Sequence, residues 1–137
     1  HSGQEFFRTK GGQSNTYNAG DQVNALDWNR KDMEIDTVQF VQFLIHLRKN
    51  NRCFRYDDYE VIRENVSTAN IDHRMIEYTL HQDIGEYKDF IVYFNASTNT
   101  IEVDVEEGFS LLCHSEKGKI VDNKLKVDGV CLAILAR

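Results

Sequence analysis

The residues best suited to bind a polar ligand are gathered in one irregular stretch near the start of the chain, SNTYNAGDQVNALDWNR (residues 14–30). Its amides, carboxylates and aromatic rings supply hydrogen-bond donors and acceptors beside flat apolar faces. The stretch shows neither the period of an amphipathic helix nor the alternation of a strand. Loops of this kind usually bind a ligand or pack against residues that do. The stretch therefore predicts a binding loop, which neighbouring elements must hold in place.

The cysteines and histidines do not predict a metal or redox centre. Cys53, Cys113 and Cys131 are odd in number and widely spaced, so they do not form a disulfide framework. We expect them to be buried, reduced thiols of a cytoplasmic protein. The five histidines show no ligand spacing with these cysteines. No metal and no cofactor is therefore expected.

Charge and hydropathy argue against two kinds of partner. The net charge is −6, and no cluster of Lys and Arg is interleaved with aromatic residues, so nucleic-acid binding is not expected. The longest apolar run, VCLAILA, is far too short to span a bilayer, so no membrane partner is expected. Apolar residues make up 41% and charged residues 28% of the chain, which is typical of a globular protein.

The first element with a clear helical period is DTVQFVQFLIHLRKN, residues 36–50. Apolar side chains recur there at steps of three and four residues, and Arg48 and Lys49 suit the negative end of the helix dipole. Asp36 is the predicted N-cap of this helix. The residues before it, 1–35, are polar and aperiodic.

A second, shorter helix is predicted at YDDYEVIRENV, residues 56–66, with Asp57 as its cap. Beyond it the period changes to two, which predicts short strands. These expected strands are residues 74–81, 89–94, 100–106, 109–113, 119–121, 124–127 and 130–136. Connections this short require antiparallel pairing, and Asp128-Gly129 has the composition of a two-residue hairpin turn. Residues 67–137 are thus expected to form a small antiparallel β-sandwich, in which the strands of FIVYF and VCLAILA are central.

The opening residues resemble a known family. HSGQEFFRTKGG, then Asn15 and Tyr17 in NTYN, then GDQVNALDWNRK and FLIHLRK, are similar to the end of the catalytic barrel of type I pullulanases, in the α-amylase superfamily. The similarity is dense over residues 2–49, and beyond about residue 67 only the architecture corresponds. It implies a mainly β chain, in which a C-terminal antiparallel β-sandwich follows the last loop and helix of a (β/α)8 barrel. The expected division is residues 1–55 for the end of the barrel and 56–137 for the sandwich with its short leading helix.

The resemblance also implies a function. Members of the family hydrolyse α-1,6-glucosidic branch links of α-glucans with retention, using carboxylates at the ends of barrel strands four, five and seven. Those carboxylates would lie upstream of His1, so no catalytic residue is expected within the chain and the chain alone is expected to be inactive. The best candidates for sugar contacts are Asp21 and Asn24, which match the family's Asp-x-x-Asn. Arg8, Asn15 and Tyr17 come next.

Other interpretations of these residues remain open. Asn15 and Asn24 could satisfy loop backbone groups, and Tyr17 and Trp28 could serve packing, which is favoured for Trp28. The second half could instead be a stand-alone carbohydrate-binding β-sandwich, or a purely structural domain. Because the helix at 36–50 has a wide apolar face, we also expect non-native self-association of the isolated chain.

Overall fold

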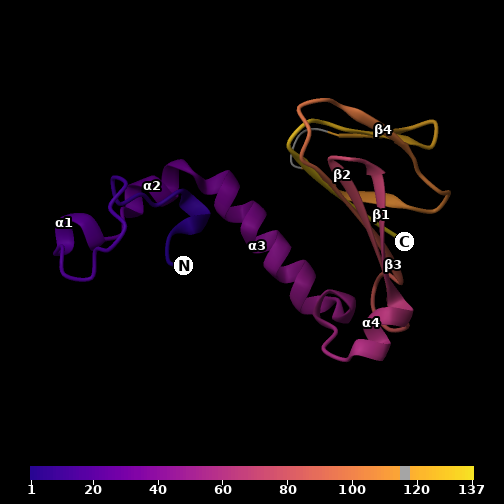
Figure 1. Ribbon diagram of the computed structural model, residues 1–137, viewed down its shortest axis with the longest axis horizontal. Coiled ribbons are helices and arrows are strands. Elements are labelled where there is room, and N and C mark those ends of the chain that lie inside the picture. The colour runs from indigo at the N-terminus through magenta and orange to yellow at the C-terminus, as the bar shows by residue number, and fades with distance from the viewer. Residues whose placement is uncertain (115–117) are drawn as a thin grey trace. The chain divides into compact units, whose positions relative to one another are not determined.

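The computed structural model describes residues 1–114 and 118–137 (Figure 1). The described chain divides into two compact units, His1–Lys49 and Asn50–Arg137. The first unit holds the candidate binding loop and the second holds the strands. Among the described residues, no helix combines the length and the apolarity that crossing a membrane requires.

Short helices organise the first unit before its one long helix. They are the 3-10 helix η1 (Gln4–Phe6), the single turn α1 (Asp21–Asn24) and α2 (Trp28–Met33). Asp27 caps α2, because its carboxylate accepts a hydrogen bond from the Arg30 amide at 3.1 Å. Helices of one or two turns are too short to show a period in the sequence, and for this reason the first 35 residues looked aperiodic.

The long helix α3 (Ile35–Asn50) confirms the predicted helix and corrects its start. The amide of Val38 donates to the carbonyl of Glu34 at 3.1 Å, so Asp36 lies inside the first turn. The prediction of Asp36 as N-cap is therefore wrong. Its carboxylate still lies near the positive end of the helix dipole, while Arg48 and Lys49 lie in the last turn as expected.

In the second unit, the 3-10 helix η2 (Arg52–Arg55) and the helix α4 (Tyr59–Asn65) precede the strands. The carboxylate of Asp58 accepts hydrogen bonds from the amides of Glu60 and Val61 at 2.9 and 3.1 Å. Asp58 is therefore the cap, and the prediction of Asp57 misses it by one residue. Two adjacent aspartates offer the same cap chemistry, so the sequence alone does not distinguish them.

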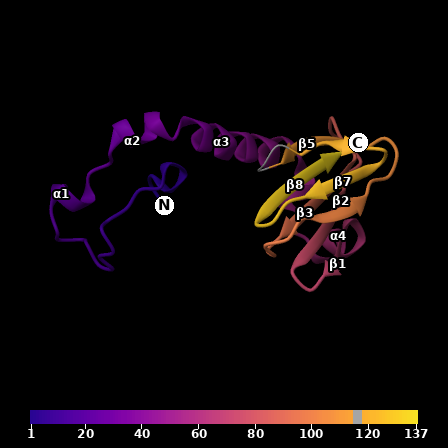
Figure 2. The ribbon, with the colours of Figure 1, turned by 90° about the horizontal axis from the view of Figure 1, so that it is seen from above.

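The strands form two antiparallel sheets (Figures 1 and 2). The five-stranded sheet has the order β1-β2-β3-β8-β5 and the three-stranded sheet the order β4-β7-β6. The strand bounds are β1 Val66–Asp72, β2 Met75–His81, β3 Asp89–Asn95, β4 Ile101–Asp104, β5 Ser110–His114, β6 Ile120–Val121, β7 Lys124–Val127 and β8 Cys131–Ala136. The predicted central position of β3 and β8 is confirmed. With its helical first unit, however, the chain is mixed rather than mainly β.

Both sheets contribute to one hydrophobic core. Tyr93 and Leu135 of the larger sheet and Leu125 of the smaller one are 1% exposed or less and lie in the same cluster. Val103 and Val105 belong to this cluster and Ile101 packs against it, so alternate side chains of this segment face the core. Burying large side chains from both sheets stabilises the unit by roughly 1.5–3 kcal/mol for each fully buried side chain.

The expected hairpin at Asp128-Gly129 is wrong, because β7 and β8 lie in different sheets. A Cβ on Gly129 would lie 2.6 Å from the carbonyl carbon of Thr98, so glycine is needed here for close backbone approach. The tight hairpin lies instead between β6 and β7, where Asp122 and Asn123 have φ of 50° and 58°. Strand β1 was not predicted, because its residues are polar and exposed and show no alternation.

Candidate functional site

Four of the predicted contact residues line a single open hollow in the first unit. Its volume is about 650 Å³. The lining residues are Lys10, Ser14, Asn15, Thr16, Tyr17, Gly20, Asp21 and Asn24. The structure therefore brings Asn15, Tyr17, Asp21 and Asn24 to one place, and the fifth candidate, Arg8, lines a neighbouring hollow of about 310 Å³.

The single helical turn α1 holds Asp21 and Asn24 in this lining. It starts after Gly20, whose φ of 76° is a conformation that glycine adopts without strain. The amides of Asn24 and Ala25 close the turn by donating to the carbonyls of Gly20 and Asp21 at 3.1 and 2.9 Å. Asp21 is the first residue of the turn, and its side chain is exposed.

The amide group of Asn24 is bonded within the loop. Its Nδ2 donates to the carbonyl of Thr16 at 2.6 Å, and its Oδ1 accepts from the Thr16 hydroxyl at 2.9 Å. Lys10 Nζ donates to the same hydroxyl at 2.5 Å. Asn24 therefore satisfies loop groups, as the alternative interpretation of the sequence proposed, and it also lines the hollow.

Arg8 does not line the same hollow but bonds to the backbone of the α1 turn. Its guanidinium donates a close hydrogen bond to the carbonyl of Asn24 and a longer one, of 3.4 Å, to the carbonyl of Ser2. Among the described residues, Arg8 Nε is a buried polar atom without a hydrogen-bond partner. The structure thus gives Arg8 a contact that shapes the α1 turn.

The two remaining candidates are open to solvent. Tyr17 is 85% exposed and lines the hollow, and Asn15 is also exposed. An exposed ring beside amides and a carboxylate can stack on an apolar ligand face while the polar groups bind hydroxyls. Trp28 is not in the lining; its ring centroid lies 6.3 Å from that of Phe6, and its side chain is 61% exposed.

The lining supports binding more than catalysis. Its carboxylate is that of Asp21, whereas retaining glycoside hydrolysis uses two carboxyl groups about 5 Å apart. Among the described residues, no group of three or more His, Cys, Asp or Glu side chains could hold a metal ion. The three cysteines are free, and burial raises the pKa of the Cys53 thiol to about 11.

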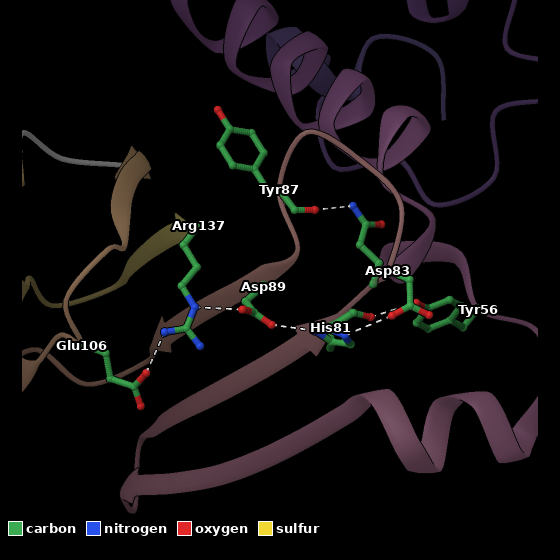
Figure 3. Close-up of polar contacts among 8 residues, drawn as sticks. Tyr56, His81, Asp83, Tyr87, Asp89, Glu106 and Arg137 are labelled. Atoms are coloured by element: carbon green, nitrogen blue, oxygen red, sulfur yellow. Dashed lines mark hydrogen bonds and ion pairs between the residues drawn. The ribbon is translucent and has the colours of Figure 1, made fainter.

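A second polar network lies in the strand unit, where it joins the last residue of the chain to the sheet (Figure 3). Arg137 Nε donates to Asp89 at 2.8 Å and its Nη1 to Glu106 at 3.0 Å. His81 Nδ1 donates to the same Asp89 at 2.7 Å, and its Nε2 lies 3.5 Å from Asp83. His81 is thus a hydrogen-bonded histidine between two carboxylates.

The network shifts the pKa of both central groups. The hydrogen bond to Asp89 raises the pKa of His81 above its ordinary value, against a smaller opposing effect of burial. Burial pushes the pKa of Asp89 upward, but the hydrogen bonds from Arg137 and His81 outweigh it and leave that pKa lowered. The network therefore favours the charged form of both side chains.

Sequence reasoning missed Thr16 and Lys10. Thr16 is 4% exposed and lies between exposed residues on both sides. No local signal marks it, because its partner Asn24 is eight residues away and the contact depends on how the loop folds. A buried hydroxyl in an otherwise exposed loop is visible only in three dimensions.

Comparison with known proteins shows what the chain is similar to. No family model matches the chain. A pullulanase of Bacillus subtilis (strain 168) is 33% identical over a 143-residue alignment, which covers 98% of the chain and 20% of that protein.

Solved structures extend this similarity to the fold. The crystal structure of a pullulanase from Anoxybacillus sp. LM18-11 with maltotetraose has a TM-score of 0.91 at 28% identity, covering 100% of the chain and 20% of its own. Type I pullulanase from Bacillus subtilis str. 168 with maltose has a TM-score of 0.86 at 32% identity, covering 99% and 20%. The chain spans about a fifth of the length of these relatives. It therefore matches the C-terminal fifth of type I pullulanases over nearly its full length, at about 30% identity.

Proposed function

We propose that the chain is the C-terminal part of a pullulanase-type hydrolase that cleaves α-1,6-glucosidic branch links in pullulan, starch or glycogen. In this proposal the first unit is the last loop and helix of a (β/α)8 barrel, with α3 as the final barrel helix. The second unit is the C-terminal antiparallel β-sandwich. The full-length similarity to type I pullulanases supports the proposal, as does the core that the two sheets share.

The role proposed for the chain is substrate binding rather than bond cleavage. The observation that carries it is the shared hollow. Four candidate residues lie within ten positions of sequence and line one surface: Asn15, Tyr17, Asp21 and Asn24. Relatives of the same fold were crystallised with maltotetraose and with maltose. An α-glucan is therefore the proposed ligand, and the cleaving carboxylates are proposed to come from outside the chain.

Asp21 is the sharpest test of this role. We expect Asp21→Ala, in the full-length protein that carries this chain, to lower kcat/KM on pullulan by about threefold to tenfold, the effect of losing one hydrogen bond to a sugar hydroxyl. Asn18→Ala is the matched control, because Asn18 is exposed in the same loop and outside the lining. Equal activity of both variants and the wild type would refute the role of the hollow.

A cytoplasmic location is a further proposal. It is supported by three free cysteines, two of them, Cys53 and Cys131, 3% and 5% exposed. Reduced thiols persist in a reducing compartment. Fractionation of cells that produce the full-length protein is the test, and recovery from the culture medium would refute it.

A further inference from the structure

Thr16 makes two hydrogen bonds to the side-chain amide of Asn24, one through its hydroxyl and one through its carbonyl. Thr16 is 4% exposed, whereas its neighbours Asn15 and Tyr17 are open to solvent. A polar side chain buried in so open a loop costs free energy unless its hydrogen bonds are made. Its hydroxyl and its carbonyl are both bonded to Asn24. The hydroxyl also accepts from Lys10, and the carbonyl from the amide of Ala19 at 3.0 Å.

The chemistry of these partners fixes the direction of each bond. A lysine ammonium has donors only, so the Thr16 oxygen accepts from Lys10 and its own proton goes to Asn24 Oδ1. The carbonyl of Thr16 only accepts, so it selects the Nδ2 end of the same amide. A flipped Asn24 would place its oxygen against that carbonyl, so two acceptors would face each other with no proton between them. The arrangement therefore has one favourable state.

Asn24 still has capacity to bind a ligand in this state. One Nδ2 proton and one lone pair of Oδ1 are not used by Thr16, since an amide has two donor protons and two acceptor lone pairs. A free donor next to a free acceptor matches a pair of neighbouring hydroxyl groups, each of which can donate and accept. The bonds to Thr16 thus determine which hydroxyl meets the donor and which meets the acceptor.

We propose that Thr16 is a positioning residue for sugar binding: through its hydroxyl and its carbonyl, it presets the amide of Asn24 for two vicinal hydroxyls of an α-glucan. This inference rests on the proposed function of the hollow. Preorganisation of this kind increases affinity because the ligand does not have to order the side chain on binding. The charged ammonium of Lys10 donates to the Thr16 hydroxyl and so strengthens the hydrogen bond that this hydroxyl donates to Asn24.

The test begins with the orientation itself. In the 137-residue chain, we expect the side-chain amide protons of Asn24 to exchange with water more slowly than those of the exposed Asn18, as measured by NMR. Thr16→Val keeps the shape and the backbone carbonyl but removes the hydroxyl, so it should reduce this difference, and Thr16→Ser should restore it. Equal exchange of Asn24 and Asn18 in the wild type would overturn the proposal.

The functional test uses the full-length protein and pullulan. We expect Thr16→Val to lower kcat/KM about threefold to tenfold and Thr16→Ser to restore most of it. If Thr16 acts through Asn24, Thr16→Val should have little further effect in an Asn24→Ala background, while its effect should multiply with that of Asp21→Ala. A full effect of Thr16→Val in the Asn24→Ala background would show a merely structural role and overturn the proposal.

Different results would refute the proposed function and the positioning role of Thr16. A wild-type protein without activity on pullulan and without affinity for maltotriose would refute the proposed function, even with a protected Asn24 amide. An active wild type whose Thr16→Val variant is equally active would refute the positioning role alone.

Discussion

The buried amide of Asn95 is expected to be the most sensitive polar position of the strand unit. Asn95 is 3% exposed at the end of β3. Its Nδ2 lies 2.8, 3.0 and 2.9 Å from the carbonyls of Asn99, Val127 and Asp128, and its Oδ1 accepts from the amide and hydroxyl of Ser97 at 3.0 and 2.7 Å. The side chain therefore connects the turn after β3 to the segment where the chain leaves β7 for the other sheet.

The expected cost follows from the number of bonds. An NH2 group has two protons, so three carbonyls share two donated bonds, and two accepted bonds from Ser97 bring the total to about four. At about 1 kcal/mol for each bond, reduced because neighbouring bonds are not additive, Asn95→Ala should lower the free energy of unfolding by about 3 kcal/mol.

A shape-conserving variant sharpens the prediction. Asn95→Asp keeps the acceptor and replaces the donor with a carboxylate that faces carbonyl oxygens, so it should be more destabilising than Asn95→Ala at neutral pH. Those surroundings would raise the pKa of the introduced carboxyl in the folded state. Its protonated form can donate, so the variant should recover stability as the pH falls and lose it as the pH rises.

Urea denaturation of the chain provides the assay, followed by the NMR amide signals of β3 and β8 because the one tryptophan, Trp28, reports on the other unit. Asn70→Ala is the matched control, since Asn70 is exposed in the edge strand β1. An effect of Asn95→Ala below about 0.5 kcal/mol, or no larger than that of the control, would refute the reasoning.

We make four further predictions. The folded pKa of His81 is raised and that of Asp89 is lowered. Their pair should therefore stabilise the fold most between about pH 4 and 6.5, and this contribution should be lost as the pH rises through the pKa of folded His81. His81→Gln should reduce the pH dependence of the urea midpoint, measured from about pH 4.5 to 8.5. Val130 is 77% exposed with a φ of 53°, so Val130→Asn should raise stability by about 1 kcal/mol in the same assay, and a loss would contradict this strain argument. The isolated chain should release no reducing sugar from pullulan, because it is not expected to hold the catalytic carboxylates. It should also self-associate through the apolar side of α3, where Ile45 is 52% exposed. Sedimentation equilibrium is the test, and a strictly monomeric chain would refute the association.

The strands were predictable where burial produces a pattern. Strands β3 and β8 are apolar on both faces, so their central position could be inferred, whereas the exposed edge strand β1 left no pattern. The wrong prediction of a hairpin at Asp128-Gly129 has a different cause. A glycine before a strand is consistent with a turn and equally with close backbone approach, and only the position of Thr98 decides between them.

The candidate site was predictable in its residue types but not in its internal bonding. Asn24 and Asp21 lie on one turn, so their spacing already places them together. The contact between Asn24 and Thr16 depends on the path of the chain through Gly20. The φ of this glycine is 76°, and the neighbouring residue types do not determine it. Residue types therefore indicate what a loop can bind, and the fold determines how its groups are oriented.

The same distinction decides what each substitution in the hollow can show. Asn24 combines two roles, because its amide holds Thr16 and lines the hollow, so removing it changes loop structure and ligand contacts together. Asp21 is exposed, and the structure describes no side-chain hydrogen bond for it among residues 1–114 and 118–137. Loss of affinity in Asp21→Ala therefore reports on the ligand contact alone. We expect Asn24→Ala to lower kcat/KM more than Asp21→Ala does. If Thr16→Val alone lowers kcat/KM by the ratio between these two effects, that ratio measures the contribution to binding of holding the Asn24 amide in place.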